Sequence, residues 1–175
     1  MTSTVTLTID NQLGKMGQPD ELFTLTPHKD KAYLVAGQVV TEPSSVPNQT
    51  ASKPNNGGIY QATSNPPRVR GIANYLLPDD QNQLVIFFTY GNCRLLIISK
   101  NLQLDDQLVQ KAEDNGSNRV SGSFVQNNEV YTFQIIVNTT TSTDGKVTMC
   151  FLTATNTYTM YIQGLESESE ALIGA

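Results

Sequence analysis

The sequence predicts an all-β protein: a β-sandwich of about ten strands with one short flanking helix. Its length of 175 residues is that of a single domain, which we expect to span residues 1–175. The chain holds 20 Thr and 15 Asn but only 15% charged residues, a composition that suits half-buried strands joined by turns. Apolar residues also alternate with polar ones along most of the chain, and a period of two is that of a β-strand.

Alternating apolar patterns, separated by turn signals such as Asn127-Asn128 and Thr155-Asn156, define the expected strands. Residues 84–88 are apolar without alternation, so this strand should be central and covered on both faces. The expected strands are residues 5–10, 22–26, 32–35, 71–77, 84–90, 93–99, 120–126, 130–137, 146–152 and 158–163.

Three segments depart from this pattern. Residues 105–114 hold helix formers with acidic residues in the first turn and Asn115-Gly116 as a stop, so we predict a helix that packs on the sheets. Residues 41–67 contain five of the eight Pro and predict a long Pro/Asn/Gly-rich surface loop. That loop is either a solvated connector or a binding or assembly arm. Residues 164–175 predict an acidic tail.

Charge and cysteine content narrow the function classes. The formal net charge is −5 and the four Arg and seven Lys are scattered, so no nucleic-acid partner is expected. No signal peptide precedes the first strand and the longest apolar runs are too short to span a bilayer, which favours a cytoplasmic protein or one released without a signal peptide. Cys93 and Cys150 favour two buried free thiols, with a disulfide left open.

The sequence lacks the residues that most enzymes and metal sites need. His28 is the only imidazole, no GxSxG motif positions a nucleophile, and no set of His, Cys and acidic residues has zinc spacing. We therefore predict a non-enzymatic protein with no catalytic residue, metal or cofactor.

Several short motifs resemble those of pore-forming toxins. Residues 8–15, Thr-Ile-Asp-Asn-Gln-Leu-Gly-Lys, are similar to the first core strand of actinoporins, the sea-anemone cytolysins, and residues 70–88 resemble that family's central hairpin. Residues 145–150 and the segment up to Met160 resemble the last strand pair of the bacterial thermostable direct haemolysins, in which a second Cys stands at the place of Met160. Mushroom fruit-body lectins share the sandwich architecture that the resemblance implies.

The resemblance implies a cytolysin-like binding function, but this sequence departs from the actinoporins in two respects. The first strand begins by Val5, so the amphipathic helix that those toxins insert into the membrane is not expected here. The turn Tyr90-Gly91-Asn92 replaces their Tyr- and Trp-rich phosphocholine loop, and the chain has no Trp. A quaternary ammonium needs an aromatic cage, so sphingomyelin recognition is not expected.

We therefore expect a lectin or cytolysin-like defence or toxin protein that binds a cell-surface glycan or lipid headgroup on a target membrane, as a homo-oligomer. The alternatives are a haemolysin-type oligomeric pore-forming toxin and an intracellular assembly protein that displays residues 41–67. Sugar sites use Tyr faces together with Asn and Arg donors near turns. The candidate ligand-binding residues are Tyr75, Tyr90, Asn92, Arg94, Asn138, Tyr158 and Tyr161.

Overall fold

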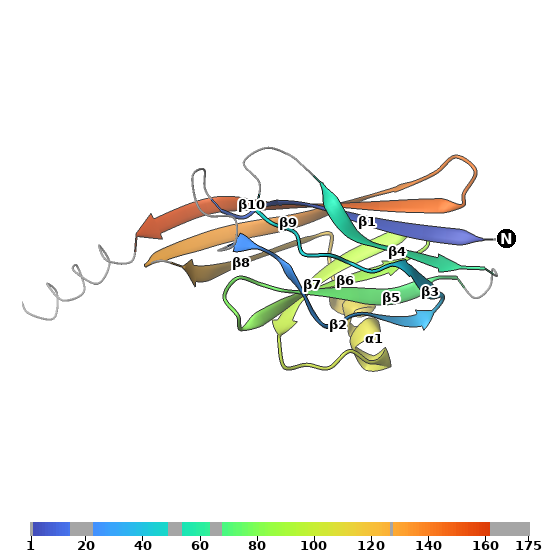
Figure 1. The fold of residues 1–175 in the computed structure, drawn as a ribbon, viewed down its shortest axis with the longest axis horizontal. Helices are drawn as coiled ribbons and strands as arrows, with labels where there is room; N and C mark the ends of the chain where they lie inside the picture. The colour runs from blue at the N-terminus through green and yellow to red at the C-terminus, as the bar shows by residue number, and fades with distance from the viewer. Residues whose placement is uncertain (1, 15–22, 49–53, 64–67, 127, 162–175) are drawn as a thin grey trace, which may run out of the picture.

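The computed structural model describes residues 2–14, 23–48, 54–63, 68–126 and 128–161. Its elements are β1 (Ser3–Gln12), β2 (Thr26–Ala36), β3 (Gln38–Thr41), β4 (Asn55–Ala62), β5 (Arg70–Leu76), β6 (Asn82–Thr89), β7 (Asn92–Ser99), α1 (Asp106–Asn115), β8 (Arg119–Gln126), β9 (Glu129–Thr141) and β10 (Val147–Tyr161). The larger sheet has six strands in the order β3-β4-β1-β10-β9-β8 and the smaller has four in the order β2-β5-β6-β7. Figure 1 shows the sheets stacked on each other, with α1 on the outer face of the smaller one. This two-layer arrangement is the all-β sandwich that the sequence predicts.

The six-stranded sheet is built around β1. This strand pairs in parallel with β10 and antiparallel with β4, so the first and last strands of the described chain lie side by side in one sheet (Figure 1). Val5, Leu7 and Ile9 are fully buried, whereas the threonines between them lie on the opposite face of the strand. The alternation in the sequence thus separates a core face from an outer face.

The four-stranded sheet is buried on both faces at β6. Leu84, Ile86 and Phe88 belong to the core between the two sheets, and Val85 and Phe87 to a second cluster under α1. Both sets are fully buried, which confirms the prediction that this apolar strand is covered on both sides.

Helix α1 begins and ends as the sequence predicts. The Asp105 carboxylate accepts a hydrogen bond of 2.8 Å from the Leu108 amide, a typical N-cap contact, and the Gly116 amide donates to the Ala112 carbonyl. Leu108 and Ala112 are buried against the sheet. This packing places the C-terminal end of α1 close to β7.

One predicted strand and one predicted loop are wrong. At residues 22–26, of which 22 lies outside the described residues, Leu25 forms only an isolated two-bond bridge with Val46. Within residues 41–67, by contrast, β4 is an inner strand of the six-stranded sheet. Its sequence begins Asn-Asn-Gly-Gly, which is typical of turns, but Gly58 adopts a φ of 116° at a bulge and lets the Tyr60 ring pack over it.

The turn expected at Thr155-Asn156 is also wrong, because β10 runs unbroken from Val147 to Tyr161. A bulge after Asn156 takes the place of a turn, and the Asn156 side chain donates to the Leu13 carbonyl at 3.0 Å. The expected strand of residues 158–163 is therefore the end of β10 as far as Tyr161. Residues 162–163 and the acidic tail lie outside the described residues.

The two cysteines form a disulfide, so the expectation of free thiols is wrong. Cys93 in β7 and Cys150 in β10 face each other across the sandwich with their Cα atoms 6.4 Å apart. That spacing is within the usual range for a disulfide. The bond joins the two sheets and closes a long loop, with 57 residues separating its ends.

Candidate functional site

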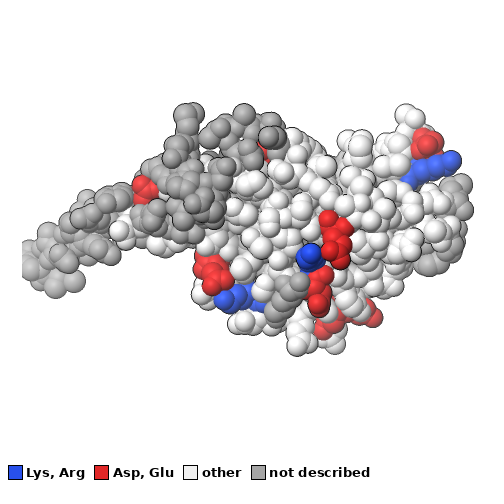
Figure 2. All heavy atoms as spheres, in the orientation of Figure 1, with Lys and Arg blue, Asp and Glu red and all other residues white. Residues whose placement is uncertain are grey.

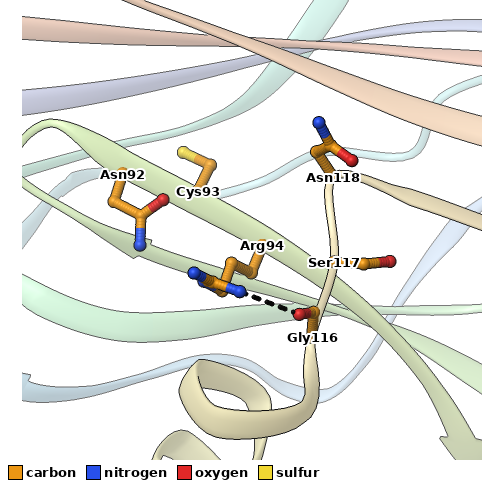
Figure 3. A pocket seen from close by; sticks show the side chains of 6 residues that line it. All are labelled: Asn92, Cys93, Arg94, Gly116, Ser117 and Asn118. Atoms are coloured by element: carbon orange, nitrogen blue, oxygen red, sulfur yellow. Dashed lines mark hydrogen bonds between the residues drawn. The ribbon is translucent and has the colours of Figure 1, made fainter.

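A polar hollow of about 340 Å³ lies where β7 passes the C-terminal end of α1. Figure 3 shows Asn92 and Arg94 on one wall and the chain segment from Gly116 to Asn118 on the other. Both Asn92 and Arg94 are among the residues that the sequence predicts for a binding site. The hollow is lined by Asn92, Cys93, Arg94, Gly116, Ser117 and Asn118.

The alternation of β7 determines which side chains reach this hollow. Cys93 and Leu95 point into the core between the sheets, so Asn92 and Arg94 project from the opposite face (Figure 3). The strand follows a tight turn at Tyr90-Gly91, in which Gly91 adopts a φ of 81°. This turn is fixed in place because the Gly91 amide donates to the Thr148 hydroxyl of β10 at 2.8 Å.

Arg94 carries the only charge among the residues that line the hollow. Its Nη1 donates to the Gly116 carbonyl at 3.1 Å, which is the dashed line in Figure 3. Its Nε is buried and has no hydrogen-bond partner, and no carboxylate of the described residues lies within ion-pair distance. A buried donor without a partner indicates a missing water molecule or ligand group.

The opposite wall is held rigidly against β7. Ser117 and Leu95 exchange two backbone hydrogen bonds of 2.7 and 3.0 Å, and the Asn118 carbonyl accepts from the Val137 amide of β9. A β-carbon at Gly116 would approach the Ala112 carbonyl oxygen to 2.3 Å and the Arg94 β-carbon to 2.9 Å. Glycine is therefore required where this segment passes Arg94.

The polar groups that remain available in the hollow are two amides and a guanidinium. The side chains of Asn92 and Asn118 make no hydrogen bond with another described residue, whereas the Ser117 hydroxyl is bonded to the Arg119 carbonyl. These groups offer donors and acceptors at neutral pH but no carboxylate, imidazole or thiol. The described lining can therefore bind polar ligand groups.

The other candidate residues do not gather at this hollow. Tyr75 is fully buried, donates to the Ser44 carbonyl, and burial raises its phenol pKa, so its role is structural. Tyr90 lies at the turn beside Asn92, with the Arg68 guanidinium 5.0 Å from its ring centre. Asn138 is exposed on the outer face of the six-stranded sheet. Tyr158 and Tyr161 belong to β10, but their side chains lie outside the described residues.

Sequence reasoning missed the second wall of the site. The sequence predicts Gly116 only as a helix stop and gives no prediction for the Ser117-Asn118 pair that follows it. A polar pair between a helix stop and a strand was the available signal. The contact with Arg94 spans 22 residues and could not be read from local pattern.

Outside this hollow, the described residues offer few other features that could bind a ligand. No group of three or more His, Cys, Asp or Glu within the described ranges could hold a metal ion, and no helix in them is long and apolar enough to cross a membrane. A second hollow of about 250 Å³ lies beside the N-terminal half of α1, between Leu102 and Lys111. Figure 2 shows charged side chains in small groups, mostly of mixed sign, on a largely uncharged face.

Comparison with known proteins does not assign the chain to a family. No protein-family model matches it, and no curated protein matches its sequence at a significant level.

Proposed function

We propose that this chain is a non-enzymatic binding protein of actinoporin-like fold that recognises a sugar or lipid headgroup on a cell surface, in a lectin or cytolysin-like role. The observation that carries the proposal is the hollow between Asn92, Arg94 and Asn118. It presents hydrogen-bonding groups without partners on a rigid frame, and such groups orient a polar ligand. The family part of the proposal rests on the sequence motifs alone.

A glycan is the better supported of the two ligands. The hollow is lined by polar groups and a disulfide cysteine, and no aromatic or aliphatic side chain of the described residues lines it. Hydroxyl-rich ligands are bound through amide and guanidinium groups of this kind. A phosphocholine headgroup could place its phosphate on Arg94, but the described lining offers no aromatic ring for its quaternary ammonium.

Self-association is part of the proposal, because weak single sites gain strength when several act together. The edge strand β3 supports it: all four residues from Gln38 to Thr41 are exposed at the end of the six-stranded sheet. Such an edge can pair with another chain. The assembly-protein alternative would have to use the rest of residues 41–67, since Asn55–Ala62 forms an inner strand.

A glycan array probed with the full chain tests the proposal. We expect binding to a defined set of glycans, agglutination of erythrocytes, and inhibition of that agglutination by the free sugar. Leakage of dye from liposomes at micromolar protein would place the chain among cytolysins, and agglutination without leakage would place it among lectins. An array and lipid strips that are both blank would contradict the proposal.

A further inference from the structure

We propose, building on the glycan-binding function above, that the hollow selects acidic sugars. The ligand group is a carboxylate or sulfate, and Arg94 is its counter-ion. The amides of Asn92 and Asn118 would bind the hydroxyl groups around it. The inference rests on a comparison of Arg94, whose charge has no described counter-ion, with Arg70, whose charge is paired with Glu113.

Arg70 and Arg94 lie on the same face of the four-stranded sheet but differ in their partners. Arg70 in β5 is opposite Thr89 in β6, and Thr89 is opposite Asn92 in β7, so the three form one row across the sheet. The Arg70 guanidinium is neutralised by Glu113 at 3.0 Å and also contacts Gln110. This arginine needs no further anion.

Arg94 lies in the next row on the same face of the sheet, opposite Phe87. Its guanidinium is bonded to a carbonyl oxygen, whereas that of Arg70 is bonded to a carboxylate. Its hydrogen bond to Gly116 uses one guanidinium donor and leaves the charge and other donors without a described partner in a half-buried position. A partly desolvated charge without a counter-ion is costly, and a carboxylate or sulfate can bind two parallel donors of a guanidinium. An anionic group from outside the chain supplies the missing partner.

The frame around Arg94 favours a defined geometry for this contact. Cys93 lies between Asn92 and Arg94, and its disulfide to Cys150 anchors β7 to the other sheet. The opposite wall is tied to the same strand by the bonds between Leu95 and Ser117. Donors on a rigid frame lose little entropy on binding, which favours recognition of a small anionic sugar.

The preference is tested by titrating the full chain with monosaccharides and following backbone amide signals by NMR. The acidic probes are N-acetylneuraminic acid, glucuronic acid and galactose 6-sulfate, and the neutral probes are galactose and N-acetylgalactosamine. We expect at least one acidic probe to bind more tightly than both neutral sugars, and its affinity to fall with added NaCl. Equal binding of acidic and neutral sugars would overturn the inference.

Variants connect the preference to Arg94. We expect Arg94→Gln to weaken binding of the acidic sugar by about tenfold or more, as loss of a charge-assisted pair does. Arg70→Gln is the matched control on the same face. It should change the affinity for the acidic sugar by less than about twofold, since Arg70 is already paired. An Arg94→Gln variant that binds the acidic sugar like the wild type would refute the proposal.

A second variant distinguishes a loss of binding from a loss of folding. Asn92→Asp is nearly isosteric and places a carboxylate beside Arg94, so it should abolish the acidic preference while the thermal unfolding midpoint stays near that of the wild type. Retained acidic preference in Asn92→Asp would contradict the role given to Arg94.

The outcomes separate this inference from the function on which it rests. Binding of neutral sugars without an acidic preference removes the inference and leaves the glycan-binding function. Absence of binding to every probe and to the array removes both. Binding of vesicles that contain a phosphoinositide, lost in Arg94→Gln, with no acidic sugar bound, would identify a lipid phosphate as the ligand and overturn the sugar assignment.

Discussion

Removing the Cys93–Cys150 disulfide should destabilise the protein markedly. The bond closes a loop across 57 residues, and loop closure of that length lowers the entropy of the unfolded chain by an amount worth about 4 kcal/mol. This is a large share of the roughly 5–15 kcal/mol that stabilises a typical domain. Loss of the bond also frees β7 from β10, so the geometry of the Asn92–Arg94 wall should loosen with it.

Guanidinium unfolding of the oxidised and reduced full chain measures this contribution. We expect the free energy of unfolding to fall by about 4 kcal/mol on reduction. The double variant Cys93→Ala/Cys150→Ala serves as control, and it should resemble the reduced wild type under both conditions. The reasoning is refuted if native, unreduced protein shows two reactive thiols, or if reduction leaves the unfolding midpoint unchanged.

Three further predictions concern stability and the wall of the hollow. Asn11→Ala should cost about 3 kcal/mol in urea unfolding, because its buried amide donates to the Phe23 carbonyl and accepts from the Leu13 amide, which would both lose this partner. The Val46 carbonyl would lose one of its two bonds and keep the one from the Leu25 amide. A loss below about 0.5 kcal/mol would contradict this prediction. Gly116→Ala should lower the unfolding midpoint and weaken binding, since the added β-carbon collides with Arg94 and the last helical turn, and an unchanged midpoint would show that the wall can move. Burial raises the pKa values of Tyr60 and Tyr75 above 10.0. Their contribution to stability should therefore be fully present below about pH 10 and fall above it, where the unfolded chain ionises first. Urea midpoints that do not decrease between about pH 9 and 11 would refute this.

Local pattern predicted the parts of the fold that depend on local physics. The alternation of Val5, Leu7 and Ile9 reflects one buried face, and the unbroken apolar run of β6 reflects two. Acidic residues in the first turn predicted the start of α1, and the structure shows that the Asp105 side chain caps it by accepting from one of the first amides. In each case the signal and its cause lie within a few residues of one another.

What the sequence did not predict depends on contacts between distant segments. The Asn-Asn-Gly-Gly start of β4 is turn-like, and it is a strand because β1 pairs with it. The later residues of β4 are paired on both sides, by β1 and by β3. The disulfide was missed for the same reason, since nothing near Cys93 shows that Cys150 faces it. The candidate site also has a predicted and an unpredicted part. Asn92 and Arg94 were predicted because they lie near a turn. Asn118 lies beside them because the segment after α1 is bonded to β7 through Ser117 and Leu95.

The central claim is that the hollow between β7 and the segment after α1 is the ligand site. Mapping of amide chemical shifts with a sugar selected on the array tests it directly. The account predicts that the largest changes fall at residues 92–94 and 116–118 and disappear in Arg94→Gln. Changes confined to the outer face of the six-stranded sheet, or to the second hollow beside α1, would contradict it.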